Sequence, residues 1–224
     1  MASAGVHASN DVRRLPIEQG LREWEARSRR EAERGVGEGK VETAAIFDND
    51  GNPITAYLGD RHSVGFEPKM LNVEGATFTH LHPDNNFGGT LSLQDLKVMA
   101  RSKWSELRAT SKQGQLYSIK ANANANREGL RKWINSNEKL LQKNFRNSAE
   151  SAYRNATTPL KSGPNKGKVK LNLPNGTVKY VEPMTKQQAR AYARQYSVGL
   201  FERAYRKNLS KFGFEFTKTK SLNK

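Results

Sequence analysis

The sequence contains no cysteine, which excludes disulfide bonds, cysteine-bound zinc and a thiol nucleophile. Any metal ion must therefore be held by histidine, carboxylate or water ligands. Apolar runs are also short, and none approaches the length that spans a bilayer. The first ten residues lack the apolar centre of a signal peptide. These absences predict a soluble protein made in the cytoplasm.

The 224-residue chain carries a net charge of +16, and this charge is unevenly distributed. Residues 1–125 hold 16 Lys/Arg and 16 Asp/Glu, whereas residues 126–224 hold 22 and 6. A basic half of this kind indicates a polyanionic partner, most often nucleic acid, because its cations displace the counterions condensed on phosphates. The alternative is a solvated basic surface without a partner.

Three regions are expected along the chain. Residues 1–40 predict a disordered start followed by a charged helix at 17–34, with a thin apolar stripe that includes Leu21 and Trp24. Hydrophobic residues make up only 35% of the chain, which is enough for one modest core. The alternating and β-branched patterns of residues 41–120 predict that core. We expect five strands and one short helix there, at 41–47, 54–58, 73–79, 93–102 (the helix), 107–110 and 115–119.

Beyond the low-complexity run 121–126, the pattern changes to helical spacing. Helices are predicted at 127–155 and 186–211. Between them, Asn175-Gly176 predicts a tight turn that joins strands 169–173 and 178–181 into a hairpin. Residues after Phe216 are expected to be a frayed tail. The fold class is therefore α/β (or α+β): a mixed sheet with flanking helices, plus a basic helix–hairpin–helix extension at 121–224.

Two histidines, His80 and His82, follow a β-branched and aromatic run, so on a strand both imidazoles would leave on the same face. Pro83 stops the strand, and a Gly-rich loop leads to Ser92, which can cap a helix with Asp95 in its first turn. Such a turn can return a carboxylate to the two imidazoles. Two histidines, an aspartate and an open fourth position are the ligand pattern of catalytic zinc.

With the upstream carboxylate Glu42, this set resembles the JAB/MPN (JAMM) metalloprotease superfamily, whose pattern is a Glu, then His-x-His, then Ser-x-x-Asp. Within it, the likeness is to the branch of RadC-like bacterial proteins and of His-x-His-Pro modules in phage head proteins. The resemblance covers about residues 41–120 and implies a JAB-like sheet. Nine residues separate His82 from Ser92, a longer spacing than the family usually has, so the place of Asp95 depends on how the longer loop is accommodated.

The resemblance implies a zinc-dependent hydrolase that acts on a peptide or isopeptide bond, with zinc on His80, His82 and Asp95. Glu42 would be the general base, and Ser92 would hydrogen-bond the developing oxyanion or the water. Glu67 is the alternative base. Two other hypotheses stay open: a non-catalytic, nucleic-acid-associated phage virion protein, and a metal-dependent nuclease. The expected partners are a polypeptide substrate and nucleic acid on the basic half, in the host cytoplasm or the virion.

Overall fold

The computed structural model describes residues 19, 21–25, 42–60, 63–82, 90–111 and 115–220. The predictions for residues 1–16 and 35–39, and for the loop 83–89, lie outside this range. Residues 19 and 21–25 are helical, within the helix predicted at 17–34. The chain divides into two compact units. We call Met1–Asn85, Gly89–Arg131 and Leu209–Lys224 the sheet unit, and Asn86–Gly88 with Lys132–Asn208 the arm unit.

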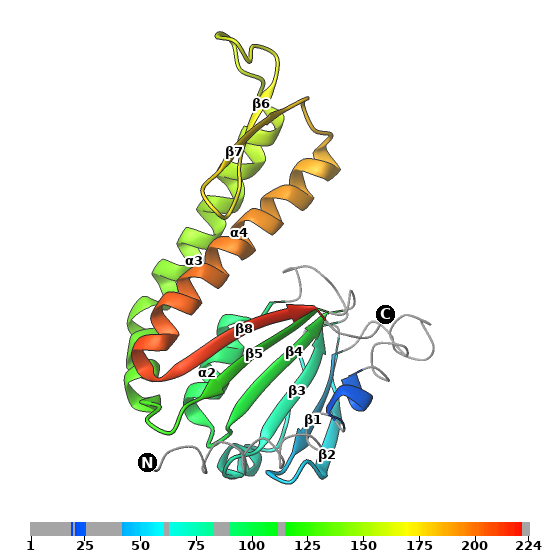
Figure 1. Ribbon diagram of the computed structural model, residues 1–224, viewed down its shortest axis with the longest axis vertical. Coiled ribbons are helices and arrows are strands. Elements are labelled where there is room, and N and C mark those ends of the chain that lie inside the picture. Colours follow the sequence, from blue (N-terminus) through cyan, green and yellow to red (C-terminus); the bar gives the residue numbers. More distant parts are fainter. Residues whose placement is uncertain are drawn as a thin grey trace, which may run out of the picture. The chain divides into compact units, whose positions relative to one another are not determined.

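The sheet unit is built on a six-stranded mixed sheet with the order β2-β1-β3-β4-β5-β8 (Figure 1). Strand β3 pairs antiparallel with β1 and parallel with β4, while the other pairs are antiparallel. The predicted α/β (α+β) class is therefore confirmed. The element bounds are β1 Thr43–Phe47, β2 Pro53–Leu58, η1 Pro68–Asn72, β3 Thr77–His82, α2 Leu93–Arg101, β4 Glu106–Ser111, β5 Gln115–Ala121 and β8 Phe214–Lys220.

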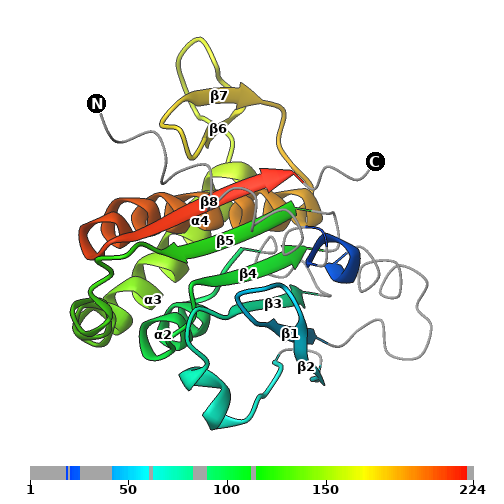
Figure 2. The same ribbon diagram turned by 60° about the horizontal axis from the view of Figure 1, so that its bottom comes forward.

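Helix α2 is the crossover that joins the parallel strands β3 and β4 (Figure 2). Its buried residues Leu96, Met99 and Ala100 form one apolar stripe at helical spacing, as the sequence predicted. The same face of the sheet carries Phe78, whose ring stacks on Trp104 at a centroid distance of 4.8 Å. This apolar packing fixes α2 against the face from which the histidines of β3 project.

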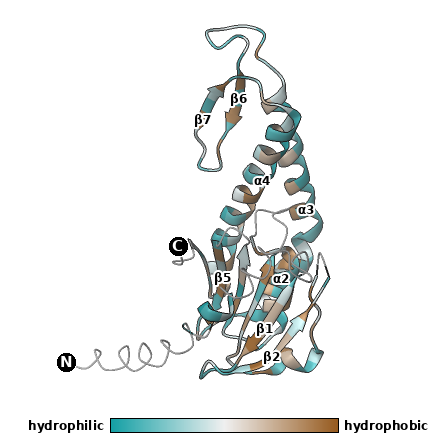
Figure 3. Cartoon of the chain, turned by 90° about the vertical axis from the view of Figure 1, so that its right-hand side faces the viewer, coloured by the Kyte–Doolittle hydropathy of each residue, from teal (hydrophilic) through white to brown (hydrophobic). Residues whose placement is uncertain are grey.

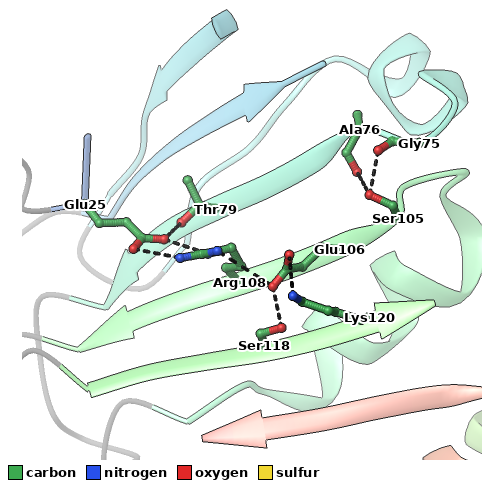
Figure 4. A network of polar contacts seen from close by, with 9 residues as sticks. All are labelled: Glu25, Gly75, Ala76, Thr79, Ser105, Glu106, Arg108, Ser118 and Lys120. Atoms are coloured by element: carbon green, nitrogen blue, oxygen red, sulfur yellow. Dashed lines mark hydrogen bonds and ion pairs between the residues drawn. The ribbon is translucent and has the colours of Figure 1, made fainter. Parts of the chain in front are cut away.

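The opposite face of the sheet carries a buried polar network that the sequence did not reveal (Figure 4). The Glu25 carboxylate accepts hydrogen bonds from Thr79 Oγ1 at 2.9 Å and from Arg108 Nε at 2.8 Å. Arg108 also lies 3.8 Å from Glu106, which in turn faces Lys120 at 3.6 Å. Burial raises the pKa of the Glu25 carboxyl, while Arg108 and Thr79 oppose that shift.

The helical segment 21–25 is therefore part of the core. Leu21 is fully buried and packs with Ala45 and Phe47 of β1, with Trp24 half-buried beside them. The prediction of a helix with only a thin apolar stripe is confirmed for Leu21 and Trp24. Its position was not predictable, because the Glu25–Arg108 pair joins residues 83 positions apart in the chain.

The prediction of a frayed tail after Phe216 is wrong for residues 217–220, which continue a strand. Strand β8 pairs with β5 from Ala121↔Phe214 to Gln115↔Lys220, and Phe214 and Phe216 are 1% and 3% exposed. The physical reason is that aromatic residues alternate with polar ones, so one face of the strand is buried although the tail is basic. The sheet unit therefore extends beyond the predicted division at residue 121 and includes the carboxyl-terminal strand.

Gly213 explains how the chain enters β8. Its φ of 76° lies in the left-handed region, which glycine adopts without steric cost. A Cβ at this position would also lie 3.0 Å from Asn124 O and from Ala125 Cα. Backbone hydrogen bonds from Asn122 N to Gly213 O and from Asn126 N to Phe212 O hold the two chain segments together.

The arm unit is built from most of two long helices and a two-stranded ribbon. The elements are α3 Arg127–Thr157, β6 Val169–Asn172, β7 Val178–Val181 and α4 Lys186–Leu209. The predicted helix–hairpin–helix order is confirmed, with the rings of Phe145 and Phe201 5.6 Å apart between the two helices. Hydrophilic colouring predominates on α3 and α4 (Figure 3). None of the described helices is long and apolar enough to cross a membrane.

We expect Glu25→Ala to destabilise the protein by roughly 3–5 kcal/mol, because it removes the carboxylate that pairs with the buried Arg108 guanidinium. Urea unfolding measures this effect. Glu23→Ala, on the exposed side of the same helical segment, is the matched control and should change stability by less than about 0.5 kcal/mol. Equal effects of the two substitutions would contradict a structural role for the Glu25–Arg108 pair.

Candidate metal centre

The candidate metal centre lies at the carboxyl-terminal end of β3, which carries His80 and His82. His80 pairs with Ala44 of β1 and with Ala109 of β4, so small side chains flank it on both neighbouring strands. Residues 80 and 82 lie on the same face, because side chains alternate along a strand. His80 is 2% exposed, and its ring lies 5.4 Å from that of Phe78. The first histidine is thus held in a dry environment, and His82 is half-buried.

The ligand atoms of His80, His82 and Asp95 lie within 4.8 Å of one another. The two Nε2 atoms are 2.8 Å apart, and Asp95 Oδ1 is 3.3 Å from His80 Nε2. Donor atoms on one tetrahedral zinc ion lie roughly 3.3 Å from each other, since each bond is about 2.0–2.1 Å long. The separations of 2.8 and 3.3 Å lie close to this value, so the three side chains could hold a single metal ion.

Asp95 is held in place by the start of α2. Ser92 is the N-cap, and its backbone N and Oγ donate to Asp95 Oδ2 at 2.6 and 2.7 Å. In return, Asp95 N donates to Ser92 Oγ at 3.2 Å. This reciprocal capping box occupies one carboxylate oxygen and leaves Oδ1 directed at His80. The predicted third ligand therefore reaches the histidines across the longer loop, and the hydroxyl hydrogen of Ser92 is directed at Asp95.

Glu42 lies immediately before β1, whose first residue Thr43 pairs with Leu81 between the two histidines. Its backbone N and O bond Asp60 O and Gly59 N at 2.7 and 2.8 Å, which extends the β1–β2 ladder by one residue. Burial raises the pKa of Glu42 to about 7, with further increases from the negative charges of Asp95 and Asp60. A carboxyl with this pKa can both accept and release a proton near neutral pH.

Three further groups bear on the site: Glu67, Asp60 and the second ring nitrogen of His80. Glu67, the alternative base, forms an exposed ion pair with Lys69 at 2.6 Å. Asp60, which sequence reasoning missed, reaches Glu42 only through the register of the β1–β2 hairpin. His80 Nδ1 is buried and has no hydrogen-bond partner among the described residues. Metal-bound histidines usually donate from this second nitrogen, so the centre departs from the common pattern there.

Comparisons with family models, with curated proteins and with solved structures found no match for this chain. The assignment of this site therefore depends on the positions of its residues alone. That geometry is a group of two histidines and one aspartate that could hold a metal ion, beside a carboxyl with a pKa near 7.

We expect the purified protein to bind one divalent transition metal ion, and His80→Ala or His82→Ala to abolish that binding. Calorimetry and elemental analysis measure it. Glu67→Ala, in an exposed ion pair with Lys69, is the control and should leave the stoichiometry unchanged. Ser92→Ala should weaken affinity by about 10–100-fold because it frees the Asp95 carboxylate, whereas Ser92→Thr should retain it. A wild-type protein without stoichiometric metal would contradict this site.

The raised pKa of Glu42 predicts a pH-dependent stability difference in the metal-free protein. The folded-state pKa of about 7 exceeds the usual value of 4.5. The stability that the protonated Glu42 carboxyl contributes to the folded protein is therefore fully present below about pH 4.5. It is lost as pH rises through about 7. Glu42→Gln cannot ionise, so it should gain stability relative to wild type between about pH 5 and pH 8. Thermal unfolding in chelator measures this, and a pH-independent difference would refute it.

Proposed function

We propose that the chain is a zinc-dependent hydrolase of the JAB/MPN (JAMM) type that cleaves a peptide or isopeptide bond. The observation that carries this proposal is the convergence of His80, His82 and Asp95 beside Glu42, whose pKa is about 7. Two neutral nitrogen ligands and one carboxylate leave a fourth position for substrate or water, as in catalytic zinc sites. A zinc ion held there would supply Lewis acidity, which acidifies water and polarises a carbonyl.

Glu42 is proposed to move the proton. Its carboxylate takes a proton from the attacking water as the water oxygen bonds to the carbonyl carbon. It then returns that proton to the leaving amine nitrogen as the carbon–nitrogen bond breaks, which yields a carboxylic acid and an amine. A base is most effective when its pKa lies near the working pH. The burial that raises the pKa of Glu42 therefore supports this role.

Ser92 is proposed to act mainly through Asp95. Its hydroxyl and backbone N both donate to Asp95 Oδ2, and this leaves Oδ1 for the metal. The oxyanion role that the resemblance implies for Ser92 stays a prediction. It would require the hydroxyl to turn away from the capping box when substrate binds. The buried rings of Phe78 and His80 limit water on the strand side of the centre.

The centre favours an amide substrate over a phosphodiester. Among the described residues, one group of three side chains converges as possible ligands, and three ligands suffice for one metal ion. Many nucleases and phosphatases instead use two metal ions about 3.5–4 Å apart. We therefore place the nuclease hypothesis third, behind the non-catalytic, nucleic-acid-associated virion protein. The proposed setting is the cytoplasm, or the virion if the protein is phage-encoded.

The test uses the full chain, stripped of metal and reloaded with zinc. We expect it to cleave members of a peptide library that includes lysine-ε-linked branches, with new termini identified by mass spectrometry. Glu42→Gln should retain zinc and lose at least about 100-fold in rate, while His80→Ala should lose both zinc and activity. Supercoiled plasmid is incubated in parallel.

Each other result points away from the proposal. Zinc-dependent nicking of the plasmid without peptide cleavage would support the nuclease. Stoichiometric zinc without any cleavage would support the non-catalytic protein. Cleavage that survives Glu42→Gln would show that another group moves the proton.

A further inference from the structure

The β6–β7 ribbon of the arm unit is anchored on one face only. Val169 and Leu171 of β6 are buried in a cluster with Ala156 of α3 and Ala189 of α4. Tyr192 of α4 donates its hydroxyl to Asn172 O at 2.6 Å. The inner face of the ribbon therefore serves as the core of this part of the arm, and the ribbon is held in one orientation relative to both helices.

The turn of the ribbon is also fixed to α4. Arg203 donates to the carbonyl oxygen of Pro174. Gly199 lies in the middle of α4, where glycine costs about 1 kcal/mol relative to alanine, and a Cβ at this position would come within 2.5 Å of Pro174 Cγ. The absence of a side chain at Gly199 thus allows the turn to pack closely against α4.

The outer face of the ribbon is exposed to solvent over much of its area. Lys170 pairs directly with Tyr180, and Asn172 with Val178, so the four project on the side away from Val169 and Leu171. Tyr180 and Val178 are 43% and 42% exposed. Two large exposed side chains beside lysines on a rigid ribbon are the composition of a contact surface rather than of a solvated edge.

The lysines around this face are not neutralised. Residues 132–208 hold 16 Lys/Arg and four Asp/Glu. In the part of the chain that the structure describes, no ion pair to a carboxylate is recorded for the exposed lysines of the ribbon and of the loop before it: Lys161, Lys166, Lys168, Lys170 and Lys179. In the sheet unit, by contrast, Arg108 and Lys120 both face Glu106. The positive charge of these five lysines thus remains available to an external anion.

We propose that the outer face of the β6–β7 ribbon, together with the loop 161–168, binds duplex DNA through its phosphates. A two-stranded ribbon fits the major groove of B-DNA, whereas the major groove of duplex RNA is too deep and narrow for side chains to read. Tyr180 is the one exposed aromatic residue on this face, too few for the stacking platforms that bind single strands. Val178 and Tyr180 offer little apolar area for insertion into a lipid surface.

The test measures binding of the full chain to a 30-base-pair duplex of arbitrary sequence by fluorescence anisotropy, in chelator and over a range of salt. Affinity should fall with salt by a log–log slope of about −0.9 per phosphate contact, without sequence preference. Replacing Lys161, Lys166, Lys168 and Lys170, which lie on the outer face and in the loop before it, with Gln should reduce the slope by about 3–4. Tyr180→Ala should weaken binding several-fold at all salt concentrations, whereas Tyr180→Phe should not.

The matched control removes the same charge from exposed positions of α3, by replacing Lys139, Lys143, Arg146 and Arg154 with Gln. It should leave the slope nearly unchanged. Equal losses in the two quadruple variants would overturn the proposal, because the arm would then be a diffuse basic surface. Tighter binding to single-stranded DNA, to duplex RNA or to phosphatidylserine vesicles than to duplex DNA would also overturn it. His80→Ala should bind DNA as wild type does, which separates this surface from the metal centre.

Discussion

Strand β3 is held on both sides, antiparallel to β1 and parallel to β4, and this pairing sets the positions of the groups around it. Because side chains alternate along a strand, His80 projects to one face while its neighbour Thr79 meets Glu25 on the other. The parallel pair also requires a crossover connection. That connection includes α2, and the first turn of α2 carries Asp95. A shift of β3 by one residue would therefore exchange the two faces and separate the metal ligands at the same time.

Charge is handled in opposite ways in the two units. In the sheet unit, buried Arg108 lies between Glu25 and Glu106, so a cation deep in the protein is compensated on both sides. On the other face, burial and the negative charges of Asp95 and Asp60 raise the pKa of Glu42, and a bound cation would relieve the repulsion between these charges. The ribbon lysines of the arm unit have no such compensation. One unit therefore contains a group that could hold a small cation, and the other offers positive charge at its surface.

Local patterns predicted much of this structure. The strands around His80, helix α2, the Asn175-Gly176 hairpin and both long helices follow from periodicity and turn residues, and the Ser92-x-x-Asp95 spacing is a capping box readable from sequence. What could not be predicted depends on pairing between distant segments. Strand β8 joins β5 across about ninety residues of intervening chain, Glu25 meets Arg108 only after the sheet forms, and Asp60 approaches Glu42 only through a hairpin register. The charged residues around Phe216 also led to the wrong prediction of a frayed tail where strand β8 lies. Composition alone does not show whether polar residues form one face of a strand or an unfolded segment.

Strands β5 and β8 are neighbours in the sheet, yet residues 132–208 of the arm unit lie between them in the chain. The chain leaves the sheet near Asn122 and returns near Gly213, and these two points are hydrogen-bonded to each other. Topologically, the arm is an insertion in a hairpin loop, and its entry and exit already satisfy the geometry of a short turn. Such an insertion can be lengthened, exchanged or lost in evolution without a change in the sheet's register. The sheet unit and the arm can thus diverge as separate modules within one gene.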